Sequence, residues 1–225
     1  MTLKQTFPVP PPSFLINYSY PDISDGTGNI IFYGYSSKED TTTDYHLHSV
    51  VLYSNDIVTS ASTISASFVK VVDNDHDIKF NVPQDIKGTI RVVLSVGMNS
   101  GTDVGHGVYA IVKIRHWDGS TETEIASAQT ETQTWDGGTS EAQSKTMNLN
   151  IPITTNKHFS KDQTFRVTVE IWGKSGNGMA GVECGYGIDP KDRNDDRSLT
   201  GSPPKIIDDD HTKQFEIHIP TRIKK

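Results

Sequence analysis

Apolar and polar side chains alternate along much of this chain, and this period of two constrains its fold more than any other feature. In the stretch 89–96, the side chains of Ile90, Val92, Leu94 and Val96 fall on one side of an extended backbone, and the residues between them fall on the other. No stretch carries an apolar stripe at positions i, i+3, i+4 and i+7 over three helical turns. The sequence therefore predicts β-strands and no long helix.

Turn signals separate the alternating stretches. The Asp118-Gly119 pair directly follows Trp117, and Asp-Gly is a strong hairpin signal because glycine adopts positive φ angles at little steric cost. Parallel strands would need crossover helices, which the pattern does not provide. We therefore expect an all-β fold, an antiparallel and jelly-roll-like β-sandwich. The predicted strands cover 14–19, 29–35, 45–54, 63–72, 77–82, 89–96, 108–117, 121–134, 146–153, 164–172, 179–188 and 215–219.

The first twelve residues differ in composition from the rest of the chain. We expect residues 1–12 to form an extended arm and residues 13–225 to form a single sandwich domain. The arm contains four prolines, Pro8, Pro10, Pro11 and Pro12. Proline fixes φ and lacks a backbone N–H group, so the segment favours an extended polyproline-like conformation. Such an arm either lies along a neighbouring subunit as an assembly arm or remains a disordered terminus.

Charge and cysteine content exclude several classes of protein. The net charge is −7, and basic residues cluster only at 222–225, so direct nucleic-acid binding is not expected. Cys184 is the only cysteine, so an intrachain disulfide cannot form. We expect no signal peptide at the start of the chain, and no stretch approaches the roughly 18 apolar residues of a membrane span. The sequence therefore predicts neither a disulfide scaffold nor a membrane protein.

No motif in the chain identifies a reaction. A nucleophile elbow and a phosphate-binding loop are both missing from the sequence, and Cys184 has no cationic neighbour that would activate its thiol. Glu170 lies in an apolar run, where we expect it to pair with an arginine such as Arg115 or Arg166. A hydrolase that uses Glu170 or one of the aspartate clusters is a weaker hypothesis. We therefore expect a protein that is not an enzyme, with no catalytic or cofactor-binding residues.

Acidic loops favour calcium over a zinc or copper site, for which His46 and His48 would be the first two ligands. The candidate calcium ligands in the late loop are Asp189, Asp192, Asn194 and Asp195. Asp73, Asp75 and Asp77 form a second run of this kind. Calcium binds six to eight oxygen ligands, but neither run has the spacing of an EF-hand. The alternative is that these carboxylates are solvated loop residues.

Two tryptophans stand beside predicted turns. Trp117 precedes Asp118-Gly119, and Trp135 precedes a similar Asp-Gly pair. Exposed aromatic rings at loop tips are typical platforms for sugar rings. The sequence therefore allows a carbohydrate-binding module with Trp117 and Trp135 as a ligand platform, and the alternative is that each ring folds over an edge of the sandwich.

Four stretches of the chain carry a resemblance to a known group of proteins: IKGTIRVVL at 86–94, KIRHWDGSTETEIASA at 113–128, FSKDQTFRVTVEIW at 159–172 and YGIDP at 186–190. In these stretches the chain resembles uncharacterised jelly-roll-like structural proteins of viruses of marine microbes, tailed viruses especially. The resemblance implies a virion component, either a capsid-decorating protein or a minor capsid or tail protein, and it implies no catalytic residues.

In that role the chain is made in a host cytoplasm and located in the virion. It forms homo-oligomers on the particle and contacts other virion proteins and, in some cases, surface glycans. The Pro-rich arm, residues 1–12, suits such assembly.

Overall fold

The computed structural model describes residues 16–17, 27–39, 42–100, 105–135, 142–176, 181–194, 206–207 and 210–222. Within these ranges the fold is built from β-strands and contains no helix. The strands are β1 (Ile16–Asn17), β2 (Thr27–Glu39), β3 (Thr42–His48), β4 (Val58–Thr63), β5 (Val69–Lys79), β6 (Gln84–Ser100), β7 (His106–Trp117), β8 (Glu122–Gln129), β9 (Gln133–Trp135), β10 (Ala142–Phe159), β11 (Thr164–Lys174), β12 (Val182–Gly187) and β13 (Phe215–Arg222). No helix of this part of the chain is long and apolar enough to cross a membrane. The arm expected at residues 1–12 lies outside the described residues.

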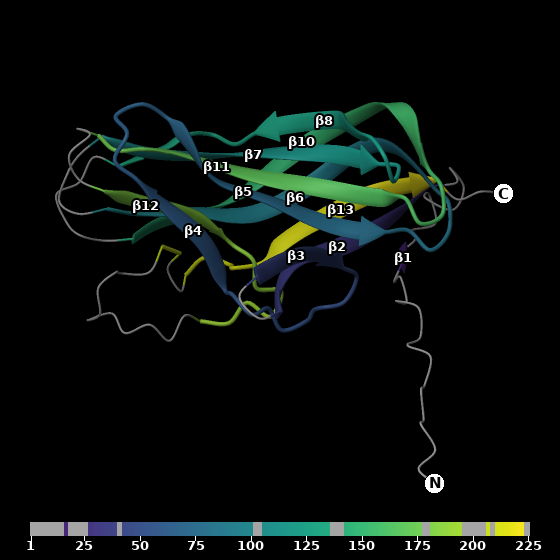
Figure 1. Cartoon of the computed structure of the whole chain (residues 1–225), viewed down its shortest axis with the longest axis horizontal. Helices are drawn as coiled ribbons and strands as arrows, with labels where there is room; N and C mark the ends of the chain where they lie inside the picture. Colours follow the sequence, from purple (N-terminus) through teal and green to yellow (C-terminus); the bar gives the residue numbers. More distant parts are fainter. Residues whose placement is uncertain are drawn as a thin grey trace, which may run out of the picture.

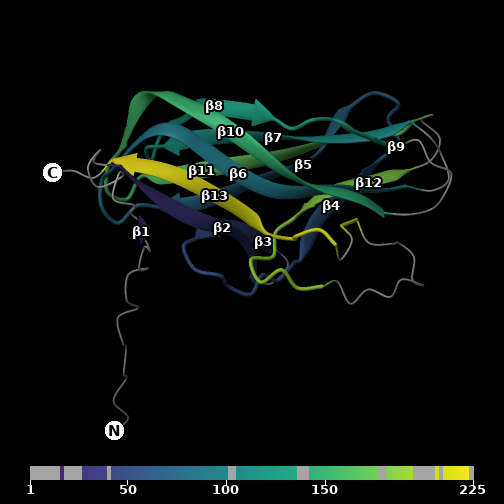
Figure 2. The same ribbon diagram turned by 180° about the vertical axis from the view of Figure 1, so that it is seen from behind.

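The strands form two layers that pack face to face (Figures 1 and 2). Hydrogen bonds connect them in the order β4-β12-β6-β13-β2-β3-β5-β11-β7-β8, with β1 beside β2, β10 beside β6 and β9 beside β7. One layer contains β5, β11, β7 and β8, and β6, β10 and β13 lie in the other (Figures 1 and 2). The ladders are antiparallel, apart from a single parallel pairing of His46 in β3 with Asp77 in β5. The predicted all-β sandwich is confirmed.

The core lies between the layers and follows the alternation in the sequence. In β6 the side chains of Ile90, Val92, Leu94 and Val96 are fully buried. In β11 the fully buried apolar set is Phe165, Val167, Val169 and Ile171. Each such side chain contributes about 1.5–3 kcal/mol by leaving water, so the inward residues of β6 and β11 account for much of the cohesion between the layers.

Several strands extend beyond their predicted ends. The sequence places the end of the last strand before Pro220, but β13 continues to Arg222. Gly88 makes this possible, because it has a φ of +125° and a Cβ there would stand only 3.2 Å from the Pro220 ring. The register between β13 and β6 shifts between His218 and Thr221, which accommodates a residue that cannot donate to the ladder. A different change affects the predicted strand 121–134, which is interrupted and forms two strands, β8 and β9.

Candidate binding face on β5, β11 and β7

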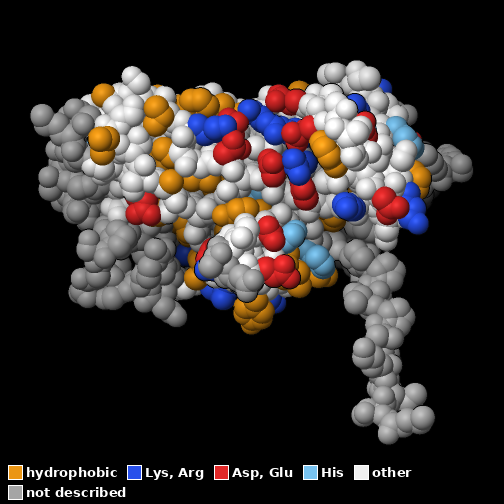
Figure 3. Space-filling model, viewed as in Figure 1, with side chains coloured by type: hydrophobic (Ala, Val, Ile, Leu, Met, Phe, Trp, Pro, Cys, Tyr) orange, Lys and Arg blue, Asp and Glu red, His pale blue; other side chains and the backbone are white. Residues whose placement is uncertain are grey.

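The outward face of the layer formed by β5, β11 and β7 carries a group of charged side chains and a group of aromatic side chains. Register places its side chains in rows: Arg166 of β11 lies between Asp77 of β5 and Arg115 of β7, and Glu170 lies opposite Asp73. Figure 3 shows charged side chains of both signs grouped on this face, with hydrophobic side chains toward its left end. The face is therefore divided into a charged part and an aromatic part.

Arg166 organises the charged part. Its guanidinium donates to both carboxylate oxygens of Asp77, from Nε at 2.7 Å and from Nη2 at 2.8 Å. It also pairs with Asp75 at 3.3 Å and with Glu122 at 3.1 Å. The hydrogen bonds to Asp77 raise the pKa of Arg166 above its usual value, with further support from the charges of the three carboxylates. Lys70 pairs with Asp73. These carboxylates therefore serve ion pairs with protein cations, which does not support the calcium hypothesis for Asp73, Asp75 and Asp77.

Glu170 lies at the border between the two parts. Its side chain is only 4% exposed. Lys113 Nζ donates to Oε1 at 2.7 Å, Lys70 Nζ donates to the same oxygen at 3.4 Å, and Trp172 Nε1 donates to Oε2 at 3.1 Å. Burial alone would raise the pKa of Glu170, but these hydrogen bonds and lysine charges outweigh it and hold the pKa below its usual value. Pairing of Glu170 was predicted correctly, but the predicted partners, Arg115 and Arg166, were wrong.

Three aromatic rings form what we call the aromatic strip: Phe68, Tyr109 and Trp172. Trp172 pairs directly with Tyr109 across β11 and β7, and their rings stack with centroids 6.0 Å apart and planes 7° from parallel. The Phe68 ring lies 4.9 Å from that of Tyr109. A Cβ at Gly107 would stand 2.9 Å from the end of the Phe68 ring, so this glycine lets Phe68 lie over β7. All three rings of the aromatic strip are partly exposed.

The sequence contains a partial signal for the aromatic strip, although the strip was not predicted from it. Tyr109 and Trp172 both occupy outward positions of alternating strands, between residues that are buried. Only the pairing of β7 with β11 brings them together, and the pairing of residues as distant in the chain as Tyr109 and Trp172 cannot be read from one sequence.

The structure does not unite the two tryptophans predicted as a platform. Trp117 is the last residue of β7, whereas Trp135 pairs with His106, the first residue of β7. A strand of this length spans roughly 35 Å, so the two residues lie at opposite ends of the sandwich. Trp117 is partly buried, and the side chain of Trp135 lies outside the described residues. A shared platform formed by Trp117 and Trp135 was therefore wrong.

The predicted calcium ligands of the late loop have other partners. Asp189 is fully buried, and its Oδ2 accepts from Arg193 Nε at 2.8 Å and from Arg193 N at 2.9 Å. Asp192 has a φ of 52°, and its Oδ1 accepts from Lys213 N at 2.6 Å. No group of three or more His, Cys, Asp or Glu residues in the described ranges could hold a metal ion. Asn194 is exposed, and Asp195 lies outside the described residues. Asp189 and Asp192 hold the loop together through these hydrogen bonds, and the calcium site stays a prediction.

Cys184 is buried in β12. Burial, aided by the negative charge of Glu183, raises the pKa of its thiol to about 12. The thiol therefore stays protonated at neutral pH and lacks the thiolate that nucleophilic chemistry needs.

A groove of about 410 Å³ runs between β8 and β10. Polar side chains such as Gln129, Thr146 and Asn148 line it, and its lining includes no aromatic residue. Lys145 and Glu131, which also line it, pair with each other at 3.3 Å. The groove therefore lacks the rings that distinguish the aromatic strip.

Solved structures share the fold at low sequence identity. An α-amino acid ester hydrolase matches with a TM-score of 0.50 and 11% identity, over 84% of this chain and 36% of the hydrolase. An aminopeptidase from the marine sediment archaeon Thaumarchaeota archaeon matches with a TM-score of 0.50 and 9% identity, over 86% of this chain and 37% of the aminopeptidase. The chain thus spans little more than a third of these neighbours. No family model and no curated protein matches it.

These neighbours correct one prediction from the sequence. We expected a protein that is not an enzyme because the sandwich carries no catalytic motif, but the same fold occurs within a hydrolase and an aminopeptidase. An all-β sandwich without a recognisable motif therefore does not indicate a non-enzymatic protein. A particle of infectious bursal disease virus, Gx strain, also matches, over 94% of this chain and 54% of the viral chain at 10% identity. Its TM-score of 0.31 is too low to support an argument.

Proposed function

We propose that this β-sandwich is a carbohydrate-binding module whose ligand surface is the aromatic strip. The observation that carries the proposal is the placement of Phe68, Tyr109 and Trp172 together on the solvent-facing side of a sheet. Sugar rings have apolar C–H faces that pack on aromatic rings, and hydroxyl groups that bond to charged side chains. Lys113, which Glu170 holds in place, lies beside the rings and provides such a group. The proposed ligand surface is therefore the aromatic strip and not the platform of Trp117 and Trp135 that the sequence predicted.

The neighbours support a module that serves a larger assembly. In the ester hydrolase and the aminopeptidase the matching part is about a third of the chain. We propose that the sandwich holds a glycan close to another domain or another protein. A rigid sheet suits this task because its backbone fixes the spacing of the rings.

Glycan binding by alanine variants tests the proposal. We expect Trp172→Ala and Tyr109→Ala to weaken binding by at least roughly tenfold, because a lost stacking contact of about 1.4 kcal/mol corresponds to a factor of ten. Affinity electrophoresis through gels that contain single polysaccharides measures this change. Trp117→Ala is the matched control, since Trp117 is a partly buried tryptophan at the end of β7 remote from the strip. Equal weakening by all three variants, or no binding to any polysaccharide, would contradict the proposal.

A virion structural role is the second candidate. Its support is the sequence resemblance across 86–190, and the coarser part of what that implies, an all-β sandwich, is the fold observed. In this candidate the chain oligomerises on a capsid or tail, with copies of itself and other virion proteins as partners, and the strip contacts surface glycans. Native mass spectrometry combined with the protein content of purified particles tests it. A strict monomer that occurs in no particle would contradict it.

A further inference from the structure

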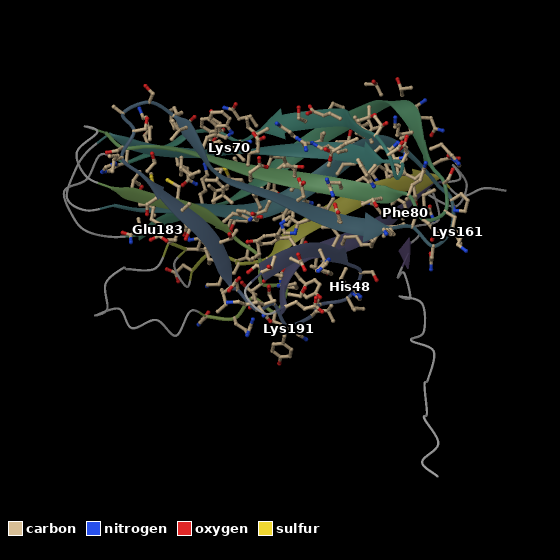
Figure 4. All side chains as sticks on the ribbon, viewed as in Figure 1. His48, Lys70, Phe80, Lys161, Glu183 and Lys191 are labelled. Atoms are coloured by element: carbon tan, nitrogen blue, oxygen red, sulfur yellow. The ribbon has the colours of Figure 1, made fainter. Side chains whose placement is uncertain are left out.

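Three lysines border the aromatic strip. Lys113 and Lys70 approach it through Glu170, and their side chains are 22% and 39% exposed. Figure 4 shows Lys70 on the same face as β5 and β11, far from Phe80 and Lys161 at the opposite end. Lys174 holds its Nζ 5.1 Å from the centroid of the Phe68 ring. The rim of the strip therefore presents ammonium groups to solvent.

The carboxylate that balances these lysines lies beneath them. Glu170 is covered, and both of its oxygens already accept hydrogen bonds, Oε1 from the two lysines and Oε2 from Trp172. A ligand that approaches the rings meets the ammonium groups and not this carboxylate. Glu170 thus fixes two cations and one ring in a single arrangement before any ligand arrives, which reduces the ordering cost of binding.

Charge on the rim differs in sign from that of the chain. Among the described residues, Glu170 and Asp73 are the carboxylates that pair with the lysines of the rim, so Lys70, Lys113 and Lys174 leave one positive charge in excess there. No described ion pair involves Lys174, whose contact is with the Phe68 ring. The whole chain carries a net charge of −7, so an anionic ligand would be repelled by most of its surface.

We infer that the aromatic strip selects acidic glycans, whose sugars carry carboxylate or sulfate groups. This inference rests on the proposed carbohydrate-binding function and adds the class of ligand. A sugar ring packs on Trp172 and Tyr109, and its anionic substituent contacts Lys113 and Lys174. Neutral glycans can make the ring contacts but not the ionic ones, and the difference in affinity between the two classes gives the selectivity.

The test compares polygalacturonate and dextran sulfate with neutral dextran and cellulose, using the full chain at 50 and 500 mM NaCl. The expected result is binding of the acidic polymers at least tenfold tighter than of the neutral ones, with the advantage shrinking at high salt as charges are screened. Lys174→Gln is expected to weaken binding of the acidic polymers about fivefold and to leave neutral binding unchanged. Lys79→Gln is the matched control, because Lys79 is an exposed lysine at the other end of β5, opposite Thr164.

Each outcome separates this inference from the function on which it rests. Equal, salt-independent binding of neutral and acidic polymers would overturn the selection of acidic glycans and leave the carbohydrate-binding function intact. Weakening by Lys79→Gln as large as that by Lys174→Gln would overturn it as well, since the effect would then reflect overall charge. Failure to bind any of the four polymers would overturn both.

Discussion

The two sides of one sheet handle polar residues in opposite ways. On the outward side of β5 and β11, Glu170 and Arg166 are ionised and neutralised by partners of opposite charge. On the inward side, His76 is fully buried, and its Nε2 lies 2.8 Å from the hydroxyl of Tyr186. Asn74 donates to the same hydroxyl at 3.1 Å. The outward side tolerates charge because its charged groups have partners of opposite charge, even where a group is as covered as Glu170, whereas the inward side keeps its polar groups neutral.

The state of His76 follows from its surroundings. Burial lowers its pKa from the ordinary value of 6.5 to about 4 and outweighs the hydrogen bond to the backbone carbonyl of His46, which acts in the opposite direction. Rings of Tyr45, Tyr186 and Phe215 surround the imidazole, at 4.9 Å in the case of Phe215. Because Tyr186 receives a hydrogen bond from Asn74, its hydroxyl proton is available to Nε2 of a neutral imidazole. The inward cluster of His76, Tyr186 and Asn74 is therefore a neutral hydrogen-bonded unit inside an aromatic cage.

Removal of the buried imidazole is expected to have the largest effect on stability. His76→Ala leaves a cavity among three aromatic rings and deprives Tyr186 of a partner, so the free energy of unfolding should fall by about 3–4 kcal/mol. His158→Ala is the control, since the His158 side chain is 48% exposed and pairs with Asp85. It should cost less than about 1 kcal/mol. Urea denaturation followed by far-UV circular dichroism measures both, and similar losses in the two variants would refute the contrast between buried and exposed histidines.

As the pH falls below neutral, the protein should first lose stability through His76 on the inward side of the sheet. The folded pKa of His76, about 4, lies below the ordinary 6.5, so the unfolded chain binds this proton more readily. Stability from this residue is therefore complete above about pH 6.5 and is lost as the pH falls toward 4, by about 3 kcal/mol in total. His76→Gln cannot titrate and should flatten this part of the curve. Urea unfolding of both proteins at intervals from pH 7.5 to 4 gives the comparison, and parallel curves would show that another group is responsible.

The alternation in the sequence predicted that Ile90, Val92, Leu94 and Val96 share a side, and all four side chains are fully buried. It did not predict which strands are neighbours, and this is where the functional predictions failed. Glu170 was expected to meet an arginine, but the register places it near Lys113. Trp117 and Trp135 follow similar turn signals, yet pairing along β7 separates them. Local pattern is set by side chains close in sequence, whereas pairing depends on contacts between distant strands.

The smallest effects should come from the outward side and should distinguish its two parts. Glu170→Gln replaces a covered carboxylate that accepts from two lysines and a tryptophan, so it should lower the free energy of unfolding by about 2 kcal/mol at pH 7. Arg166→Gln removes pairs that are more open to water, with the arginine side chain 23% exposed, and should cost about 1 kcal/mol or less. Urea unfolding at 0.1 and 1 M NaCl separates them, because the screening length falls from about 10 Å to about 3 Å.

The Arg166→Gln loss should shrink at high salt, and the Glu170→Gln loss should persist because most of it comes from covered hydrogen bonds. The pKa of Glu170 is lowered by its partners, so its contribution is present above the ordinary carboxyl pKa and is lost as the pH falls through the lower folded value. Glu170→Gln should therefore also flatten the acid limb below the range in which His76 titrates. Equal salt sensitivity of the two variants would mean that Glu170 behaves as a surface ion pair, and the contrast would then lie only between the inward and outward sides of the sheet.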